Sequence, residues 1–102
     1  MTLSITRAAV LTFGIAAALP ALAADGKAVY DKTCSVCHAT GVANAPKFGD
    51  KAAWSPRAAT GKDALLGSVL KGKGAMPPKA GNPKLTDEEV GAALDHMLAA
   101  VK

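Results

Sequence analysis

Cysteine, histidine and aromatic residues are scarce in this chain. Its 102 residues include two Cys, two His, one Trp, one Tyr and two Phe. A structural zinc site of the usual kind needs four Cys or His ligands, and the second histidine, His96, lies far from the other candidates in the sequence. We therefore exclude such a site. A domain this small with so few large side chains has a marginal core, which an enclosed apolar cofactor would complete.

Strong charge and long hydrophobic runs are also missing. Lys and Arg number 12 against 8 Asp and Glu, for a formal net charge of +4. This excess is too mild for the basic stripe of a nucleic-acid-binding protein, so we expect no nucleic-acid partner. The longest largely apolar run, residues 8–19, falls short of the about 20 residues that span a bilayer.

That apolar run belongs to a secretory signal pattern. Arg7 precedes it as a positive n-region, and Ala21-Leu22-Ala23 follows it with the small residues that signal peptidase recognises. We expect residues 1–23 to be a signal peptide, cleaved near Ala23 or Ala24. Export to the periplasm would follow, with no transmembrane anchor after processing. An uncleaved anchor helix is the alternative.

Cys34-Ser35-Val36-Cys37-His38 is the most informative stretch of the chain. C-x-x-C-H is the attachment signature of c-type haem, in which both thiols form thioether bonds with the haem. On a helix Cys34 and Cys37 share a face, and His38 lies on the same side, where its imidazole can ligate the iron. The motif predicts one covalently bound haem c.

A dithiol oxidoreductase is the alternative interpretation of the same two cysteines. C-x-x-C also occurs in thioredoxin-like proteins, within a βαβ context. Residues 24–102 show helical apolar periodicity and no strand-like alternation, so that context is missing.

We expect residues 24–102 to form one all-α domain with three main helices. These helices begin at residues suited to N-caps or capping boxes, namely Asp25, Thr60 and Thr86. The second should end at Gly72. Because they are punctuated by Gly and Pro, residues 41–59 and 72–85 are expected to be loops.

Met76 is the candidate for the second axial ligand. Its thioether, followed by Pro77 and Pro78, suits the position opposite His38 on a haem iron, and His/Met ligation raises the reduction potential. The alternative is a loop methionine that packs against apolar surface. Met97 lies in the middle of the last helix, on its apolar face, and is interpreted as core.

With these residues the chain resembles the small class I c-type cytochromes, and most closely the cytochrome c5 family. The matching stretches cover essentially all of residues 24–102: Cys34 to Gly41, Ala45-Pro46-Lys47, Gly49 to Trp54, Pro56-Arg57, Gly74 to Lys79 and Asp87-Glu88-Glu89. The resemblance implies a monohaem, all-helical fold with loops around the haem. It also implies His38 and Met76 as axial ligands, electron transfer as the role, and no catalytic residues.

The resemblance also implies roles for residues around the haem. Pro46 would accept a hydrogen bond from the His38 ring, and Trp54 and Arg57 would flank the haem near its propionates. Trp54 could instead be only core, and Arg57 only a solvated charge. The first and last helices would cross at Gly26 and Tyr30.

Two positions depart from the family pattern. His96 stands where an aromatic is usual and is interpreted as a packing residue. The cysteine pair that is common before the last helix is missing from residues 81–85.

The implied function is a periplasmic electron carrier that meets redox partner proteins at an exposed haem edge. Several lysines could surround that edge and steer acidic partners toward it: Lys47, Lys51, Lys71, Lys73, Lys79 and Lys84. Two alternatives stay open. One is a haem enzyme or ligand-binding haem protein with a labile Met76, and the other is an electron-transfer subunit of a larger oxidoreductase.

Overall fold

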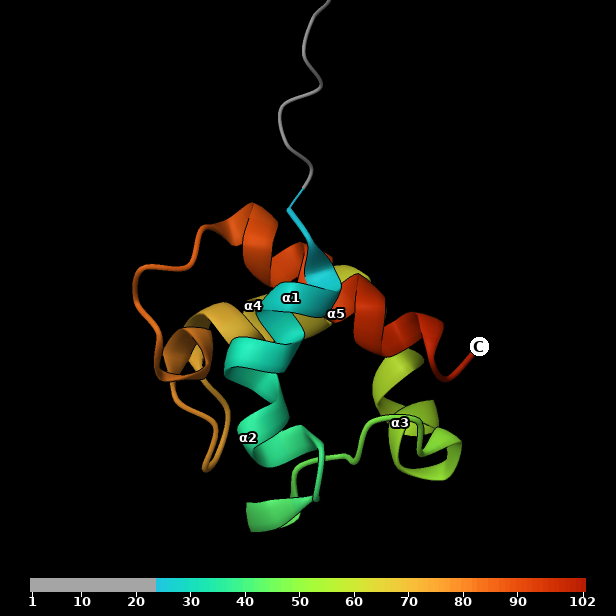
Figure 1. Ribbon diagram of the computed structural model, residues 1–102. Coiled ribbons are helices and arrows are strands. Elements are labelled where there is room, and N and C mark those ends of the chain that lie inside the picture. The colour runs from blue at the N-terminus through green and yellow to red at the C-terminus, as the bar shows by residue number, and fades with distance from the viewer. Residues whose placement is uncertain (1–23) are drawn as a thin grey trace, which may run out of the picture.

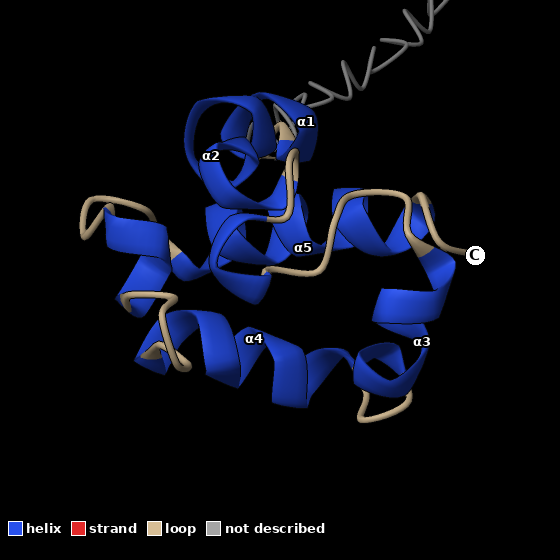
Figure 2. Ribbon diagram, turned by 90° about the horizontal axis from the view of Figure 1, so that it is seen from below, coloured by secondary structure: helices blue, strands red, loops and turns tan. Residues whose placement is uncertain are grey.

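A computed structural model describes residues 24–102, and every regular element within that range is helical (Figure 2). In chain order these elements are α1 (Gly26–Val29), η1 (Tyr30–Cys34), α2 (Ser35–His38), η2 (Val42–Asn44), α3 (Lys51–Ala58), α4 (Lys62–Lys71), η3 (Pro78–Gly81) and α5 (Asp87–Ala99). The expectation of an all-α fold is confirmed. The expected signal peptide, residues 1–23, lies outside the described residues.

The N-terminal helix carries the two cysteines and consists of α1, η1 and α2 without a break (Figure 1). Asp25 caps it as expected, since its side chain accepts a hydrogen bond from the backbone N–H of Ala28 at 3.2 Å. The middle element, η1, is a turn of π-helix, in which the N–H of Ser35 donates to the carbonyl of Tyr30. Such turns are rare and frequent at functional sites. This one ends at Cys34, directly inside the C-x-x-C-H motif.

The last helix, α5, crosses the N-terminal helix (Figure 1). Its predicted capping box is confirmed: the N–H of Glu89 donates to Thr86 Oγ1 at 3.1 Å, and the N–H of Thr86 donates to Glu89 Oε1 at 3.0 Å. At the crossing, a Cβ on Gly26 would collide with the carbonyl oxygen of Ala92. Glycine therefore permits the two backbones to approach closely.

Three rings pack together beside this crossing. The ring centroid of Tyr30 lies 4.8 Å from that of Phe48 and 5.3 Å from that of His96, and Phe48 and His96 stack at 5.2 Å. His96 thus packs as an aromatic ring, in agreement with its interpretation. The buried core of this region consists of Tyr30, Cys34, Trp54, Ala93 and Met97.

Helix α4 lies beside α5 (Figure 2), and an ion pair of 2.8 Å joins Lys62 to Asp95 across them. The helix ends at Gly72 as expected. Its predicted N-cap at Thr60 is wrong, because Gly61 holds that position. The Thr60 hydroxyl instead donates to the Arg57 carbonyl at 2.7 Å and closes the preceding helix.

The prediction that residues 41–59 form a loop is wrong where α3 lies. Asp50 caps this helix by accepting a hydrogen bond from the N–H of Ala53 at 3.2 Å, and Pro56 is accommodated inside it. Trp54 is only 4% exposed. Burial of the Trp54 ring and the cap outweigh the low helix propensity of proline. Tertiary packing overrides the local signal here.

Residues 72–85 are mostly irregular, as expected, with η3 as their one short helical turn. None of the helices in the described part of the chain combines the length and hydrophobicity needed to cross a membrane.

Candidate haem site

The helices and loops enclose a cavity of about 630 Å³. This volume lies within the about 300–1,000 Å³ typical of ligand and cofactor pockets. The four side chains expected to bond or ligate a haem line it: Cys34, Cys37, His38 and Met76. Much of the remaining wall is apolar and comes from the N-terminal helix, η2, α4, α5 and the loop before α5: Val29, Val36, Val42, Leu65, Val69, Leu85, Val90, Leu94 and Met97.

His38 is oriented through one of its two ring nitrogens. It is buried at the end of α2, and Nδ1 lies 2.9 Å from the carbonyl oxygen of Pro46. With Nδ1–H donating to this carbonyl, the ring has the tautomer that leaves Nε2 as a free acceptor. An imidazole held in this way is a suitable metal ligand.

The segment that follows Pro46 is attached to the site twice more. The backbone N–H of Phe48 donates to the His38 carbonyl at 2.7 Å. The Nε1–H of Trp54 donates to the Lys47 carbonyl at 3.0 Å, and the Trp54 ring centroid lies 5.9 Å from that of His38. Residues 46–48 therefore bond His38 on one side and α3 on the other.

Met76 is held by its backbone in a tight turn. The N–H of Lys73 donates to the Met76 carbonyl at 2.9 Å, and the N–H of Met76 donates to the Lys73 carbonyl at 3.0 Å. Gly74 takes a φ of +58° in the turn between them, a conformation that favours glycine. A Cβ on Gly72 would lie 3.0 Å from the Met76 carbonyl oxygen. The thioether thus enters the cavity from a segment distant in sequence from His38.

The two cysteines differ in environment. Cys34 is buried and Cys37 is half-buried, and both line the cavity. Burial raises the pKa of the Cys34 thiol above its ordinary value, which keeps this thiol protonated at neutral pH.

Arg57 and two of the lysines expected around the haem edge line the cavity. Arg57 lines the cavity, and its Nη1 also donates to the Ala53 carbonyl within α3 at 2.6 Å. Lys73 and Lys79 line the cavity too. The other expected lysines are exposed but do not line it: Lys47, Lys51, Lys71 and Lys84.

Several residues of the site were not predicted from the sequence. Leu85 is buried in the cavity wall although it lies in an expected loop. Gly72 packs against the Met76 carbonyl, and Phe48 donates to His38, through backbone atoms alone. A sequence pattern carries little trace of backbone contacts between distant residues. The expected site residues Cys34, Cys37, His38, Pro46, Trp54, Arg57 and Met76 all line this one cavity.

The chemical groups that line the cavity fit one covalently bound haem. Two thiols, an imidazole with a free Nε2 and a thioether surround an apolar space, which matches the requirements of a c-type haem. The fold and the site define a small monohaem cytochrome c.

Comparisons with known proteins identify the group of cytochromes c that this chain resembles. The family model described as cytochrome c oxidase, cbb3-type, subunit III matches residues 21–97. Cytochrome c-555 of Chlorobaculum thiosulfatiphilum is 51% identical over an alignment that covers 78% of this chain and 98% of that protein. Cytochrome c5 of Azotobacter vinelandii is 47% identical, with 74% and 93% covered.

A solved structure agrees with these relatives. The cytochrome c chain in a crystal structure described as an electron transfer complex of nitrite reductase with cytochrome c superposes with a TM-score of 0.74. It is 52% identical, over 76% of this chain and 95% of that one. The chain belongs to the class I monohaem cytochromes c, close to cytochrome c5. It is an electron-transfer protein rather than an enzyme, and its cofactor is one covalently bound haem c.

Proposed function

We propose that this chain is an exported, periplasmic electron carrier in which His38 and Met76 are the axial ligands of the haem iron. Cys34 and Cys37 form the covalent links to the haem. The observation that carries the proposal is the convergence of these four side chains on one cavity. When bound, a haem c supplies an iron that exchanges one electron between its ferric and ferrous states.

Hydrogen bonds from neighbouring residues orient His38 and hold the Met76 segment. Pro46 accepts the Nδ1–H of His38, which fixes the ring orientation and increases the basicity of Nε2. The turn from Lys73 to Met76 holds the thioether in place through its two backbone hydrogen bonds. With His38 and Met76 both bound to the iron, no open iron site would remain for a substrate.

We assign Arg57 and Trp54 to the haem periphery. Arg57 lies on the cavity wall, where its guanidinium can pair with a propionate carboxylate. Trp54 is buried, and its indole N–H is engaged by the Lys47 carbonyl, which places the ring next to His38 as part of the wall.

Redox partner proteins are proposed to dock where the cavity wall reaches the surface. Val36 is 73% exposed and Val42 is 49% exposed, and both line the cavity. Exposed Lys73 lines it as well and would steer an acidic partner patch. A cytochrome c of similar sequence has been crystallised in an electron transfer complex with nitrite reductase, which supports a protein partner of this kind.

Export is proposed from the signal pattern of residues 1–23, with cleavage near Ala23 or Ala24. Haem attachment to Cys34 and Cys37 would follow export. N-terminal sequencing of haem-loaded protein from the periplasmic fraction tests this part, and an N-terminus at Met1 would contradict it.

The ligand assignment is tested by optical spectra of the exported protein and of two variants. The parent should give a six-coordinate low-spin ferrous spectrum, a weak ferric iron–sulfur band and haem that stays attached in acid–organic solvent. Met76→Leu should lose the iron–sulfur band. Met97→Leu is the matched control, because it removes the other thioether of the cavity wall and should keep the band. Loss of the band in Met97→Leu alone would overturn the assignment.

A subunit of a larger oxidoreductase is the second candidate function, favoured by the description of the matching family model. The native mass of the protein in periplasmic extract, measured by size-exclusion chromatography, distinguishes the free carrier from the subunit. A single chain with haem supports the free carrier, and co-elution with a haem oxidase supports the subunit.

A further inference from the structure

Lys79 has a backbone conformation that is unusual for its residue type. It lies in η3, three residues after Met76, with a φ of +52°, and Ala80 follows with a φ of +53°. Residues other than glycine seldom adopt this left-handed region, and they do so where the surrounding structure holds them. Something outside these two residues therefore stabilises this turn.

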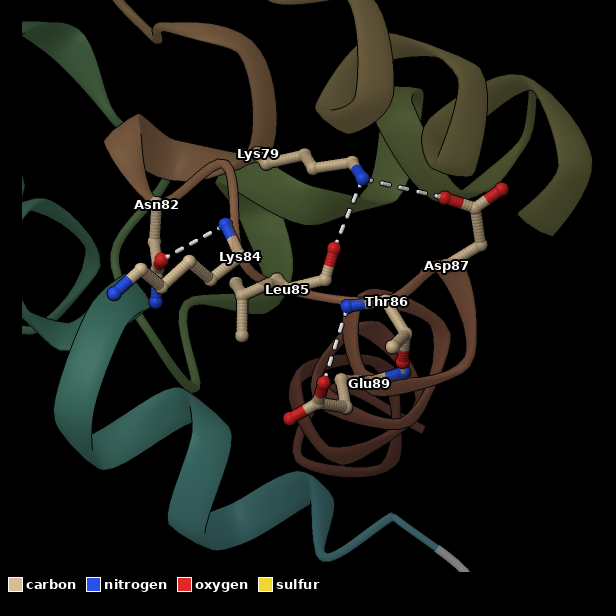
Figure 3. A network of polar contacts seen from close by, with 7 residues as sticks. All are labelled: Lys79, Asn82, Lys84, Leu85, Thr86, Asp87 and Glu89. Atoms are coloured by element: carbon tan, nitrogen blue, oxygen red, sulfur yellow. Dashed lines mark hydrogen bonds and ion pairs between the residues drawn. The ribbon is translucent and has the colours of Figure 1, made fainter.

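The Lys79 ammonium makes two contacts that can stabilise the turn at Lys79 and Ala80. Its Nζ donates to the backbone carbonyl of Leu85 at 2.9 Å and lies 3.7 Å from Oδ1 of Asp87 (Figure 3). The Lys79 side chain is only 28% exposed, whereas that of Asp87 is 68% exposed. The partly shielded, charge-assisted bond to Leu85 is thus the stronger of the two contacts.

The bond joins two parts of the haem cavity. On one side, Pro77 and Pro78 connect Lys79 to Met76 with little backbone freedom. On the other side, the side chain of Leu85 is buried in the cavity wall just before α5 begins. Figure 3 shows the Lys79 side chain reaching across from the first segment to the second.

We propose that Lys79 is a positioning residue for Met76. Its bond to the Leu85 carbonyl fastens the Met76 segment to the start of α5 and keeps the thioether at the cavity. This inference rests on the proposed function, in which Met76 ligates the iron. Lys79 acts through the backbone of residues 76–85, because its ammonium is bonded to the Leu85 carbonyl.

Three variants of the exported, haem-loaded protein test this role. Lys79→Met removes the ammonium and keeps the length of the side chain. Lys84→Met is the matched control, because it removes the same charge from the same loop. The hydrogen bond of Lys84 is made by its backbone N–H, which donates to Asn82 Oδ1 at 3.2 Å and is kept in the variant. Lys79→Arg restores a charged donor.

The first readout is the replacement of Met76 by added imidazole in the ferric protein, followed by loss of the iron–sulfur band. In Lys79→Met, imidazole should replace Met76 at about tenfold lower concentration than in the parent, as expected for loss of one charge-assisted hydrogen bond. Lys84→Met should stay within about twofold of the parent, and Lys79→Arg should return toward it. Equal behaviour of Lys79→Met and Lys84→Met would overturn the proposal.

The second readout is backbone hydrogen exchange, which does not depend on the iron ligand. The amides of Asn82 and Leu85, which donate to the carbonyls of Lys79 and Asn82, should exchange faster in Lys79→Met than in Lys84→Met. Unchanged exchange would overturn the fastening role. A parent protein without the iron–sulfur band would instead refute Met76 ligation, and with it the positioning of a ligand, while exchange would still report on the Lys79 bond.

Discussion

The ring nitrogen Nδ1 of His38 lies 2.9 Å from the carbonyl oxygen of Pro46. Two residues later, the N–H of Phe48 bonds the carbonyl of His38 itself. A three-residue segment thus holds both the side chain and the backbone of the proposed ligand. Its other support is the indole of Trp54, which bonds the carbonyl of Lys47.

Trp54→Phe should weaken this arrangement. The change keeps a buried ring but leaves the Lys47 carbonyl without its donor, so the free energy of unfolding should fall by about 1–2 kcal/mol. Urea denaturation measures this loss. Ser55→Ala, at the next and exposed position of α3, is the control and should change stability by less than about 0.5 kcal/mol. Equal stability of the two variants would contradict the role of the indole bond.

Gly26→Ala should destabilise the crossing of the first and last helices. The added Cβ meets the Ala92 carbonyl, which belongs to the backbone of α5 and cannot move aside alone. We expect a loss of about 1–3 kcal/mol in the free energy of unfolding. Gly91→Ala is the control, because a Cβ there has no atom within 4 Å and should stabilise α5 by about 0.5–1 kcal/mol. Thermal denaturation should move the two variants in opposite directions.

Gly72→Ala should loosen Met76. Gly61 and Gly72 flank α4 with positive φ angles of +94° and +84°, but only at Gly72 would a Cβ crowd the Met76 carbonyl and Pro78, each at 3.0 Å. Both variants bear the cost of a backbone conformation that is essentially restricted to glycine, about 1–3 kcal/mol. Only Gly72→Ala should also weaken the ferric iron–sulfur band. If Gly61→Ala weakens that band equally, the close approach at Gly72 has no part in holding the methionine.

Tyr30 should make folding stability fall at alkaline pH. Burial, and secondarily the negative charge of Asp31, raise the pKa of its phenol above the ordinary value of 10.0. As pH rises through 10, the unfolded chain loses the Tyr30 proton while the folded chain keeps it, so the unfolded state gains stability.

Tyr30 is the single tyrosine of the chain, so the tyrosinate absorbance reports on it directly. The folded protein should titrate at higher pH than the same protein in urea. Tyr30→Phe keeps the ring without the titrating group, and its stability should fall less steeply above pH 10 than that of the parent. Coincident titration curves for the folded and the urea-unfolded protein would show that burial does not affect the phenol.

Local signals in the sequence determined a large part of this protein. The C-x-x-C-H motif, the caps at Asp25 and Thr86 and the end of α4 at Gly72 could all be predicted, because each depends on spacing or hydrogen bonds within a few residues. The local sequence Met76-Pro77-Pro78 also predicts Met76 as the second ligand, and the ferric iron–sulfur band tests this prediction.

Only the tertiary structure decided the rest. Helix α3 forms around Pro56 because Trp54 is buried against distant elements, and Thr60 caps the preceding helix rather than starting the next. The contact of Gly72 with the Met76 carbonyl and the reach of Lys79 to Leu85 depend on positive φ angles and on backbone atoms. All backbones carry the same carbonyl and amide groups, so the residue sequence does not single out such contacts. They arise when the folded chain brings these groups together.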